Sequence, residues 1–261
     1  MRVSLIITTY NRPEALSLVL KSVVSQSKFP YEVIIADDGS EQQTKKCIDF
    51  FKESSDLNLI HSWQEDKGFR VSMSRNKAIN KSSGDYIVLI DGDMVLHDKF
   101  LEDHSKNAEL GFFVQGARVL LNQDKTNKAV LRKKIKFSFF SNGLSNRLNA
   151  IHSNFLANLF IKKKKSIVGI KACNLAFYRK DCIKVNGFNN DIIGWGREDS
   201  EFVVRLINSG INRKNIHFNL IQYHLWHPSS TRKYLKKNQL ILEKSIQKKL
   251  IYCNNGINQF L

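Results

Sequence analysis

Short apolar runs alternate with amphipathic segments along the N-terminal part of the chain. The apolar runs have the length and composition of buried strands, and they occupy Val3–Thr9, Tyr31–Ala36, Leu57–His61 and Tyr86–Ile90. After the first run, Leu16, Leu20 and Val23 recur at helical spacing, with Asn11 as the expected N-cap and Pro13 in the first turn. Strands that alternate with helices predict an α/β fold with a mainly parallel central sheet flanked by helices.

Two carboxylates one residue apart follow the last of these runs. Asp91 and Asp93 come directly after Tyr86–Ile90, with Gly92 between them. A buried parallel strand places such a turn at the carboxyl edge of the sheet, where open α/β sheets bind their ligands. Carboxylate oxygens at that edge can bind a hard divalent cation, which can in turn hold a diphosphate. A loop turn with two solvated acids explains the same three residues.

A second acidic cluster follows a tryptophan that has a glycine on either side. Residues 194–196, Gly-Trp-Gly, have the composition of a mobile loop, and the indole offers a flat face against which a sugar ring can stack. Glu198, Asp199 and Glu201 then open an amphipathic helix that Gly210 can end. Acids in a first helical turn also favour the helix dipole, which is the simpler explanation for them.

Two histidines lie three residues apart in the last quarter of the chain. His224 and His227 follow residues 216–221, whose pattern predicts another strand. Side chains at this spacing can converge on one metal ion, but a pair of solvated histidines has the same appearance. Residues 229–232 can contact phosphate, and Lys233–Leu250 predicts a basic C-terminal helix.

Segments spread over roughly residues 1–230 match a known family in order and spacing. They are TTYNRPEALSLVLKSV, EVIIADDGS, DKGFRVSMSRNKAI and GDYIVLIDGDM. On these segments the chain resembles the family 2 glycosyltransferases, which have the GT-A fold. The later segment KACNLAFYRKDCIKVNGFNNDIIGWGREDSEFVVRL is similar to the acceptor half of β-1,4-galactosyltransferases and of bacterial chondroitin-type polymerases. The resemblance implies a GT-A, nucleotide-diphospho-sugar transferase fold with a C-terminal helical tail.

The resemblance also implies which residues bind the nucleotide-sugar donor. The matching positions are Thr8, Tyr10, Arg12, Asp38, Asp66, Arg75, Asn76, Asp91, Gly92 and Asp93. Among them, Asp38 matches the acid near the base, Asp91 a contact to the ribose or metal-bound water, and Asp93 a direct metal ligand. Arg75 has an alternative interpretation as half of a structural ion pair with Asp37 or Asp85.

By the same resemblance, the later segment supplies the catalytic, acceptor and metal positions. Asp199 matches the base that takes the proton of the acceptor hydroxyl, and Glu198 matches a partner that holds the acceptor. The acceptor-binding positions are Trp195, Gly196 and Asn174. The metal ligands are Asp93, His224 and His227, a set that suits Mn²⁺ and also allows Mg²⁺. The galactosyltransferases have Met-x-x-His at the two histidine positions, so this part of the match is partial.

Length and composition fit a globular enzyme. The chain has 261 residues, is 42% hydrophobic and contains no internal repeat. We expect a glycosyltransferase domain at 1–230, with a donor half at 1–98, a basic amphipathic insert at 132–165 and an acceptor half at 165–230, and then a basic helical tail at 231–261. No apolar run reaches the roughly 18 residues of a membrane span, and residues 1–9 have a strand pattern, not that of a signal peptide. The four cysteines, Cys47, Cys173, Cys182 and Cys253, do not have the spacing of a metal site, so we expect them to be free thiols. Free thiols are typical of a reducing compartment, and a cytoplasmic location is therefore expected.

A net charge of +17 indicates an anionic partner. Basic clusters at 132–136 and 162–165 bracket an apolar stripe at helical spacing, formed by Phe140, Leu144, Leu148, Ile151, Phe155 and Leu159. Such a helix can lie on anionic lipid, which would make the protein peripheral on the inner face of the plasma membrane. Packing of the stripe on the core is the alternative. No nucleic-acid partner is expected, because no zinc-finger, basic-zipper or RNA-binding signature accompanies the charge.

The hypothesis from the sequence is a metal-dependent, inverting glycosyltransferase. It would move one hexose or N-acetylhexosamine from a UDP-sugar to a hydroxyl of a bacterial surface glycan such as lipooligosaccharide or capsule. A nucleotidyltransferase would also use paired carboxylates and a metal, but it needs a Gly-rich phosphate loop where this chain has Thr-Thr-Tyr-Asn-Arg-Pro at 8–13. A non-enzymatic basic module that binds membrane or nucleic acid would explain the charge but not the acidic clusters.

Overall fold

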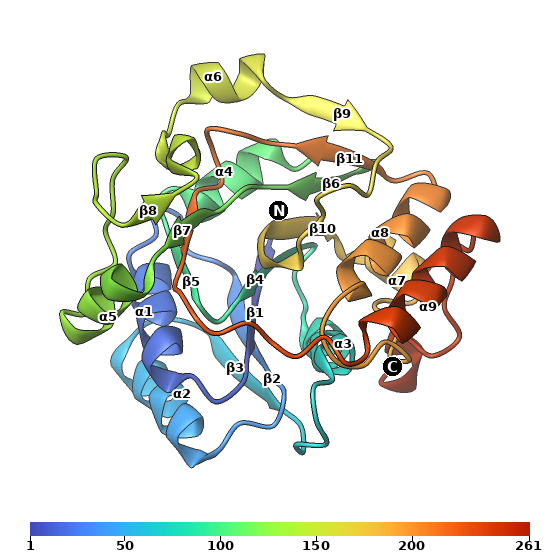
Figure 1. The fold of residues 1–261 in the computed structure, drawn as a ribbon, viewed down its shortest axis with the longest axis horizontal. Coiled ribbons are helices and arrows are strands. Elements are labelled where there is room, and N and C mark those ends of the chain that lie inside the picture. The colour runs from blue at the N-terminus through green and yellow to red at the C-terminus, as the bar shows by residue number, and fades with distance from the viewer.

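The computed structural model describes residues 1–261 and contains two β-sheets (Figure 1). The larger sheet has eight strands, in the spatial order β3 (Leu59–Trp63), β2 (Glu32–Asp37), β1 (Val3–Thr9), β4 (Tyr86–Asp91), β10 (Leu175–Tyr178), β6 (Phe112–Gln115), β11 (Asn212–Asn215) and β9 (Lys162–Lys164). The first four strands are parallel, and β10 runs antiparallel to both of its neighbours. The predicted α/β fold with a mainly parallel central sheet flanked by helices is confirmed.

The central strands are buried on both faces, which explains their continuous apolar runs. In β1, Leu5 and Ile7 belong to one core cluster with Leu16 of α1 (Pro13–Val24) and Ile48 of α2 (Gln42–Ser54). Ile6 points to the opposite face, because side chains alternate along a strand. There it joins the cluster that includes residues of α3 (Val71–Lys81), α7 (Arg179–Lys184) and α8 (Glu198–Asn208).

The smaller sheet joins segments that are far apart in the sequence. Its order is β5 (Met94–Leu96), β12 (Gln222–His224), β7 (Val119–Leu121) and β8 (Leu144–Ser145). In the antiparallel pair of β12 and β5, His224 lies opposite Met94, and the amide of Leu225 donates to the carbonyl of Asp93 at 2.9 Å. This register places the histidine segment beside the Asp-Gly-Asp turn.

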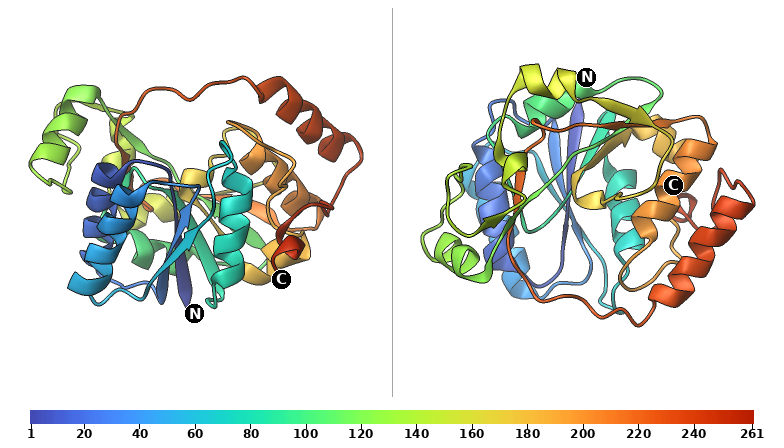
Figure 2. Two further views of the ribbon diagram at one scale, coloured as in Figure 1. Left: turned by 90° about the horizontal axis from the view of Figure 1, so that it is seen from below. Right: turned by 45° about the horizontal axis from the view of Figure 1, so that its top comes forward.

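The remaining helices lie at the periphery of the molecule (Figures 1 and 2). They are α4 (Phe100–Asn107), α5 (Gln123–Leu131), α6 (Asn154–Leu159) and α9 (Leu235–Gln247), with short 3₁₀ turns at Arg147–Ala150, Ala172–Asn174 and Ile257–Gln259. Helix α9 confirms the predicted C-terminal helix and packs beside α8. None of the helices combines the length and the hydropathy needed to cross a membrane.

Two local predictions are wrong. Helix α1 begins at Pro13 with Arg12 as its N-cap, because Asn11 adopts a positive φ of 46° and its side chain accepts a hydrogen bond from the amide of Glu41. Residues 216–221 form no strand, because Phe218 and Leu220 have φ of 63° and 56°, which interrupts an extended chain. The strands flank this segment as β11 and β12.

The predicted helix over residues 137–161 is also wrong, because Gly143 and Asn146 have φ of 77° and 56° and break it. The segment instead contains β8, a 3₁₀ turn and the short α6. Only part of its apolar stripe packs on the core: Leu144 is 8% exposed. The other side of the stripe is exposed to solvent, with exposed fractions of 84% for Phe140, 67% for Leu148, 77% for Phe155 and 66% for Leu159.

Candidate active site

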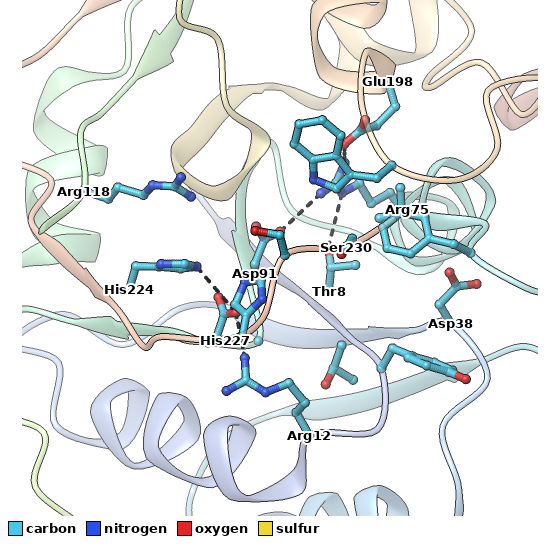
Figure 3. Close-up of a pocket in the computed structure, with 18 of the residues that line it drawn as sticks. Thr8, Arg12, Asp38, Arg75, Asp91, Arg118, Glu198, His224, His227 and Ser230 are labelled. Atoms are coloured by element: carbon cyan, nitrogen blue, oxygen red, sulfur yellow. Dashed lines mark hydrogen bonds and ion pairs between the residues drawn. The ribbon is translucent and has the colours of Figure 1, made fainter. Parts of the chain in front are cut away.

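A cavity of about 610 Å³ opens at the carboxyl ends of β1, β2 and β4 (Figure 3). Its size is in the range of small-molecule sites. Most of the predicted donor residues line it, namely Thr8, Tyr10, Arg12, Asp38, Arg75, Asp91, Gly92 and Asp93. We call it the donor cavity. The sheet edge therefore brings together side chains that are up to 85 residues apart, from Thr8 to Asp93.

The glycine between the two aspartates allows the ends of β4 and β1 to approach closely. Its amide donates to the carbonyl of Thr8 at 2.6 Å. A Cβ atom on Gly92 would lie 2.9 Å from that carbonyl oxygen and 3.1 Å from the Thr9 side chain. Any larger residue would push Asp91 and Asp93 away from the sheet edge.

Asp93, His224 and His227 form a cluster whose potential ligand atoms all lie within 4.8 Å of one another. Nε2 of His227 is 3.3 Å from Oδ2 of Asp93, and Nε2 of His224 is 3.7 Å from the same oxygen. Ligands bound about 2.1 Å from one ion stand roughly 3–4 Å apart. The other carboxylate oxygen, Oδ1 of Asp93, is buried and has no hydrogen-bond partner. Both the spacing and this unpaired oxygen fit a divalent metal ion.

The protonation states of the cluster depend on burial and on nearby arginines. Burial and the charge of Asp91 raise the pKa of Asp93 to about 6. Burial, with the charge of Arg118, lowers the pKa of His224 to about 3, so its imidazole is neutral and able to bind a metal. Nη1 of Arg12 lies 3.0 Å from Oδ2 of Asp93 and adds a further positive charge at the cluster.

Arg75 connects the donor cavity with the second acidic cluster (Figure 3). Its buried guanidinium lies 3.2 Å from Asp91 and 3.2 Å from Glu198, and its Nε donates to Oγ1 of Thr8 at 3.3 Å. The alternative pairing with Asp37 or Asp85 is wrong, since these aspartates contact His61 and Arg2 instead.

Glu198 and Asp199 form a partly buried carboxylate pair at the start of α8. Burial and the charge of Asp199 raise the pKa of Glu198 to about 7, and burial raises the pKa of Asp199. The carboxylate of Asp199 accepts hydrogen bonds from the amide of Ala172 at 3.3 Å and from the amide of Ser200 at 2.6 Å. A carboxylate with a raised pKa in a cleft is suited to take up a proton.

A second cavity of about 450 Å³ lies beside this pair, and we call it the acceptor cavity. Trp195, Gly196, Glu198 and Asp199 line it, and Trp195 is 42% exposed. The tryptophan loop is tethered: the amide of Gly194 donates to the carbonyl of Phe69, and Nδ2 of Asn238 in α9 donates to Ile193 and Gly196 at 2.9 and 3.0 Å. The loop is non-helical as predicted, and it is anchored from the C-terminal tail.

Comparison with known protein families shows which family the chain belongs to. The family model described as glycosyl transferase family 2 matches residues 4–183. The chain belongs to glycosyltransferase family 2. A second model, described as the N-terminal domain of galactosyltransferase, matches residues 156–227 of this glycosyltransferase and confirms the resemblance of its later part.

Curated relatives of the enzyme are much longer proteins. The hyaluronan synthase of Pasteurella multocida is 29% identical over 239 residues, which cover 85% of this chain and 24% of that protein. The chondroitin synthase of Escherichia coli is 26% identical over 223 residues, covering 79% of this chain and 32% of that protein. The chain thus spans about a quarter to a third of the length of these relatives.

Solved structures support the GT-A fold. Staphylococcus aureus TarS 1-349 aligns with a TM-score of 0.65 and 14% identity, over 99% of this chain and 68% of that one. The mannosyltransferase PcManGT from Pyrobaculum calidifontis, in complex with GDP-Man and Mn²⁺, aligns with a TM-score of 0.56 and 17% identity, over 95% of this chain and 72% of that one. At this level of identity the likeness concerns the fold of the glycosyltransferase.

Three predicted site residues do not line either cavity of the glycosyltransferase. The buried amide of Asn76 donates to Phe188 and Asn190, and that of Asn174 donates to the carbonyls of Ala117 and Leu220. Both side chains therefore tie distant segments together, and the structure does not bring them to the donor or the acceptor. Asp66 lies one contact away from the donor cavity, where it accepts the hydroxyl of Tyr10 at 2.8 Å.

Several lining residues are not among the predicted site residues, although all of them except Arg118 lie within the segments that carry the family resemblance. They are Phe69, Val71 and Arg118 in the donor cavity and Lys171 and Arg197 in the acceptor cavity. Ser229, Ser230 and Arg232 line the donor cavity, in the segment predicted to contact phosphate. Arg197 has a φ of 78°, a left-handed conformation that costs a residue with a Cβ about 1–2 kcal/mol. Only an unusual backbone angle, invisible in the sequence, singles out this position.

Proposed function

We propose that this glycosyltransferase takes its sugar from a UDP-sugar, depends on a divalent metal ion, and transfers the sugar with inversion to a hydroxyl of a bacterial surface glycan. The observation that carries the proposal is the position of Arg75. One buried guanidinium contacts both Asp91 and Glu198, and these three residues line the donor cavity and the acceptor cavity alike. The proposed metal ligands Asp93, His224 and His227 line only the donor cavity, and the proposed base Asp199 lines only the acceptor cavity.

On the donor side, the residues fit a nucleoside diphosphate. Asp93, His224 and His227 would hold Mn²⁺ or Mg²⁺, which when bound offsets the charge of the departing diphosphate. Arg12, Arg118 and Arg232 supply further cations along the same cavity. Asp38 and Tyr10 line the part assigned to the base. The solved complexes of TarS with UDP-GlcNAc and of PcManGT with GDP-Man and Mn²⁺ support this assignment.

On the acceptor side, Asp199 takes the proton of the attacking hydroxyl. Its raised pKa makes it a stronger base than an ordinary aspartate. Glu198 holds the acceptor hydroxyl beside it, and the exposed ring of Trp195 stacks on the acceptor sugar. One base opposite a stabilised leaving group favours a single displacement, which inverts the anomeric centre. A glycan acceptor is supported by the relatives named hyaluronan synthase and chondroitin synthase.

The test is release of UDP from a panel of UDP-sugars, with Mn²⁺, with Mg²⁺ and with a chelator. We expect one or a few UDP-sugars to be hydrolysed slowly without acceptor, and the reaction to stop in chelator. Full activity after verified metal removal would overturn the metal role. The anomeric configuration of the transferred sugar, determined by NMR, tests inversion separately.

We also propose that the surface formed by residues 137–165 contacts an anionic membrane. Its support is the exposure of Phe140, Leu148, Phe155 and Leu159 beside exposed lysines at 162–165. Apolar side chains next to cations match the boundary between acyl chains and anionic headgroups. In Figure 2 this segment, coloured from green to yellow, lies at the rim of the molecule.

A further inference from the structure

We infer that the acceptor glycan carries an anionic group, a carboxylate or a phosphate, close to the hydroxyl that is glycosylated, and that Lys171 and Arg197 bind it. The inference rests on the proposed function and specifies the acceptor class.

The acceptor cavity contains more cations than its own carboxylates neutralise. Its acids are Asp91, Glu198 and Asp199, and its cations are Arg75, Arg118, Lys171, Arg197 and Arg232. Arg75 pairs with Asp91 and Glu198. The other four cations lie in no ion pair with a carboxylate, although they line one cavity together with three acids. Cations without partners that converge on a concave site favour an anionic ligand.

The diphosphate of the donor can contact only two of these four cations. Arg118 and Arg232 line both cavities, so they face the phosphates as well. Lys171 and Arg197 line the acceptor cavity alone. Both residues are exposed to solvent, so they are free to contact a different anion, and the acceptor is the ligand of this cavity that would reach them.

Both residues are held on a fixed backbone beside the candidate base. The amide of Lys171 donates to Oε1 of the buried Gln115, and its carbonyl accepts from Nε2 of the same side chain, both at 3.1 Å. The next residue, Ala172, donates its amide to the carboxylate of Asp199. Lys171 is thus linked directly to the segment that positions the base.

Arg197 also lies close to the candidate base Asp199, in the segment that leads into α8. It lies two residues before Asp199, and its carbonyl accepts from the amide of Glu201 at 2.9 Å. Its φ of 78° is one that glycine adopts without cost, so folding alone favours glycine here. A strained residue in a cavity points to a functional side chain, and a guanidinium binds carboxylate or phosphate through two parallel hydrogen bonds.

The experiment uses the 261-residue chain with Mn²⁺ and the UDP-sugar found in the panel. Acceptors are uronate-ended oligosaccharides, the same oligosaccharides with the carboxyl reduced to an alcohol, and sugars that carry a phosphomonoester. We expect kcat/KM for one charged class to exceed that for the neutral counterpart by about tenfold or more, the effect of one charge-assisted contact. Whichever charged class is preferred identifies the anion.

The variants Lys171→Met and Arg197→Gly should each reduce that preference about tenfold. Arg197→Gly keeps the backbone conformation, so its loss cannot be attributed to misfolding. The matched control is Lys46→Met on the exposed surface of α2, which removes one charge away from the cavity and should keep the preference.

Two outcomes separate this inference from the proposed function. Equal kcat/KM for charged and reduced acceptors, with UDP release intact, overturns the inference alone. Absence of UDP release with every UDP-sugar overturns the proposed function. In that case titration of uronate and phosphate oligosaccharides into wild type and variants, followed by NMR, still tests the anion site, and absence of charge-dependent binding overturns it.

Discussion

The donor and acceptor sides of the glycosyltransferase are built in different ways. The donor side uses the ends of parallel strands β1, β2 and β4, whose registers place Thr8 opposite Asp91 and Thr9 opposite Asp37. The acceptor side consists of loops, short turns and the first turn of α8, and its loops are held by single side chains such as Gln115 and Asn238. A regular sheet edge positions a common nucleotide, and tethered loops form the part that must fit a particular glycan.

The largest effect is expected on the donor side. Asp93→Ala should reduce transfer below detection, because it removes a metal ligand and leaves the diphosphate charge uncompensated by several kcal/mol. Steady-state transfer assays and metal titration measure both consequences. Asp98→Ala, on the exposed turn after β5, removes the same charge and should retain activity. Normal activity of Asp93→Ala would show that the donor side works without this cluster.

Asp199→Asn tests the acceptor side with a side chain of the same size. Turnover should fall about 10²–10⁴-fold, because the amide cannot take up a proton, while the Kd for UDP changes little. Single-turnover rates and calorimetric UDP binding distinguish the two quantities. Lost UDP affinity with unchanged turnover would move Asp199 to the donor side.

The membrane surface gives the next largest effect. Lys163 is already engaged, with Glu109 at 2.6 Å and the ring of Phe112 at 4.4 Å. Replacing Lys162, Lys164 and Lys165 with serine should therefore lower partitioning to anionic vesicles about 10²-fold, at roughly 1 kcal/mol per lysine. Binding of the wild type should weaken as salt rises. Sedimentation with vesicles measures both, and a wild type that ignores anionic vesicles at low salt contradicts the proposal.

A smaller effect is expected at the tether of the tryptophan loop. Asn238→Ala removes the hydrogen bonds to Ile193 and Gly196, so the KM for acceptor should rise about tenfold while UDP affinity is retained. Asn208→Ala is the matched control, because Asn208 donates to Leu250 beyond the far end of α9. Equal acceptor kinetics in the two variants would show that the tether does not position the loop.

The smallest effect is a change of stability with pH. The pKa of Glu198 is raised from 4.5 to about 7 in the folded protein, so folding favours its protonated form. With respect to this group, stability is therefore greatest below about pH 4.5 and falls as the pH rises from there through 7. Glu198→Gln should flatten this part of the profile in thermal unfolding at pH 5 and pH 8. An unchanged slope would place Glu198 in a solvated environment.

The contrast between the two sides also explains what the sequence could predict. The strand before Asp91 and Asp93 is a local pattern, and parallel pairing brings its end to the sheet edge by geometry. The helix predicted over residues 137–161 does not form, because Gly143 and Asn146 adopt a positive φ. The spacing of the apolar residues alone favours a helix there. Asn76 and Asn174 match family positions, but their amides serve long-range backbone contacts that no local pattern reveals.

The tether from α9 has a consequence for how such enzymes diversify. The side chain that holds Ile193 and Gly196 lies more than 40 residues further along the chain, in a helix none of whose residues lines the donor cavity. Grafting the tryptophan loop of another family member onto this scaffold should fail unless the tail is exchanged with it. Conversely, we expect substitutions in α9 to change the choice of acceptor while the donor cavity keeps its lining residues.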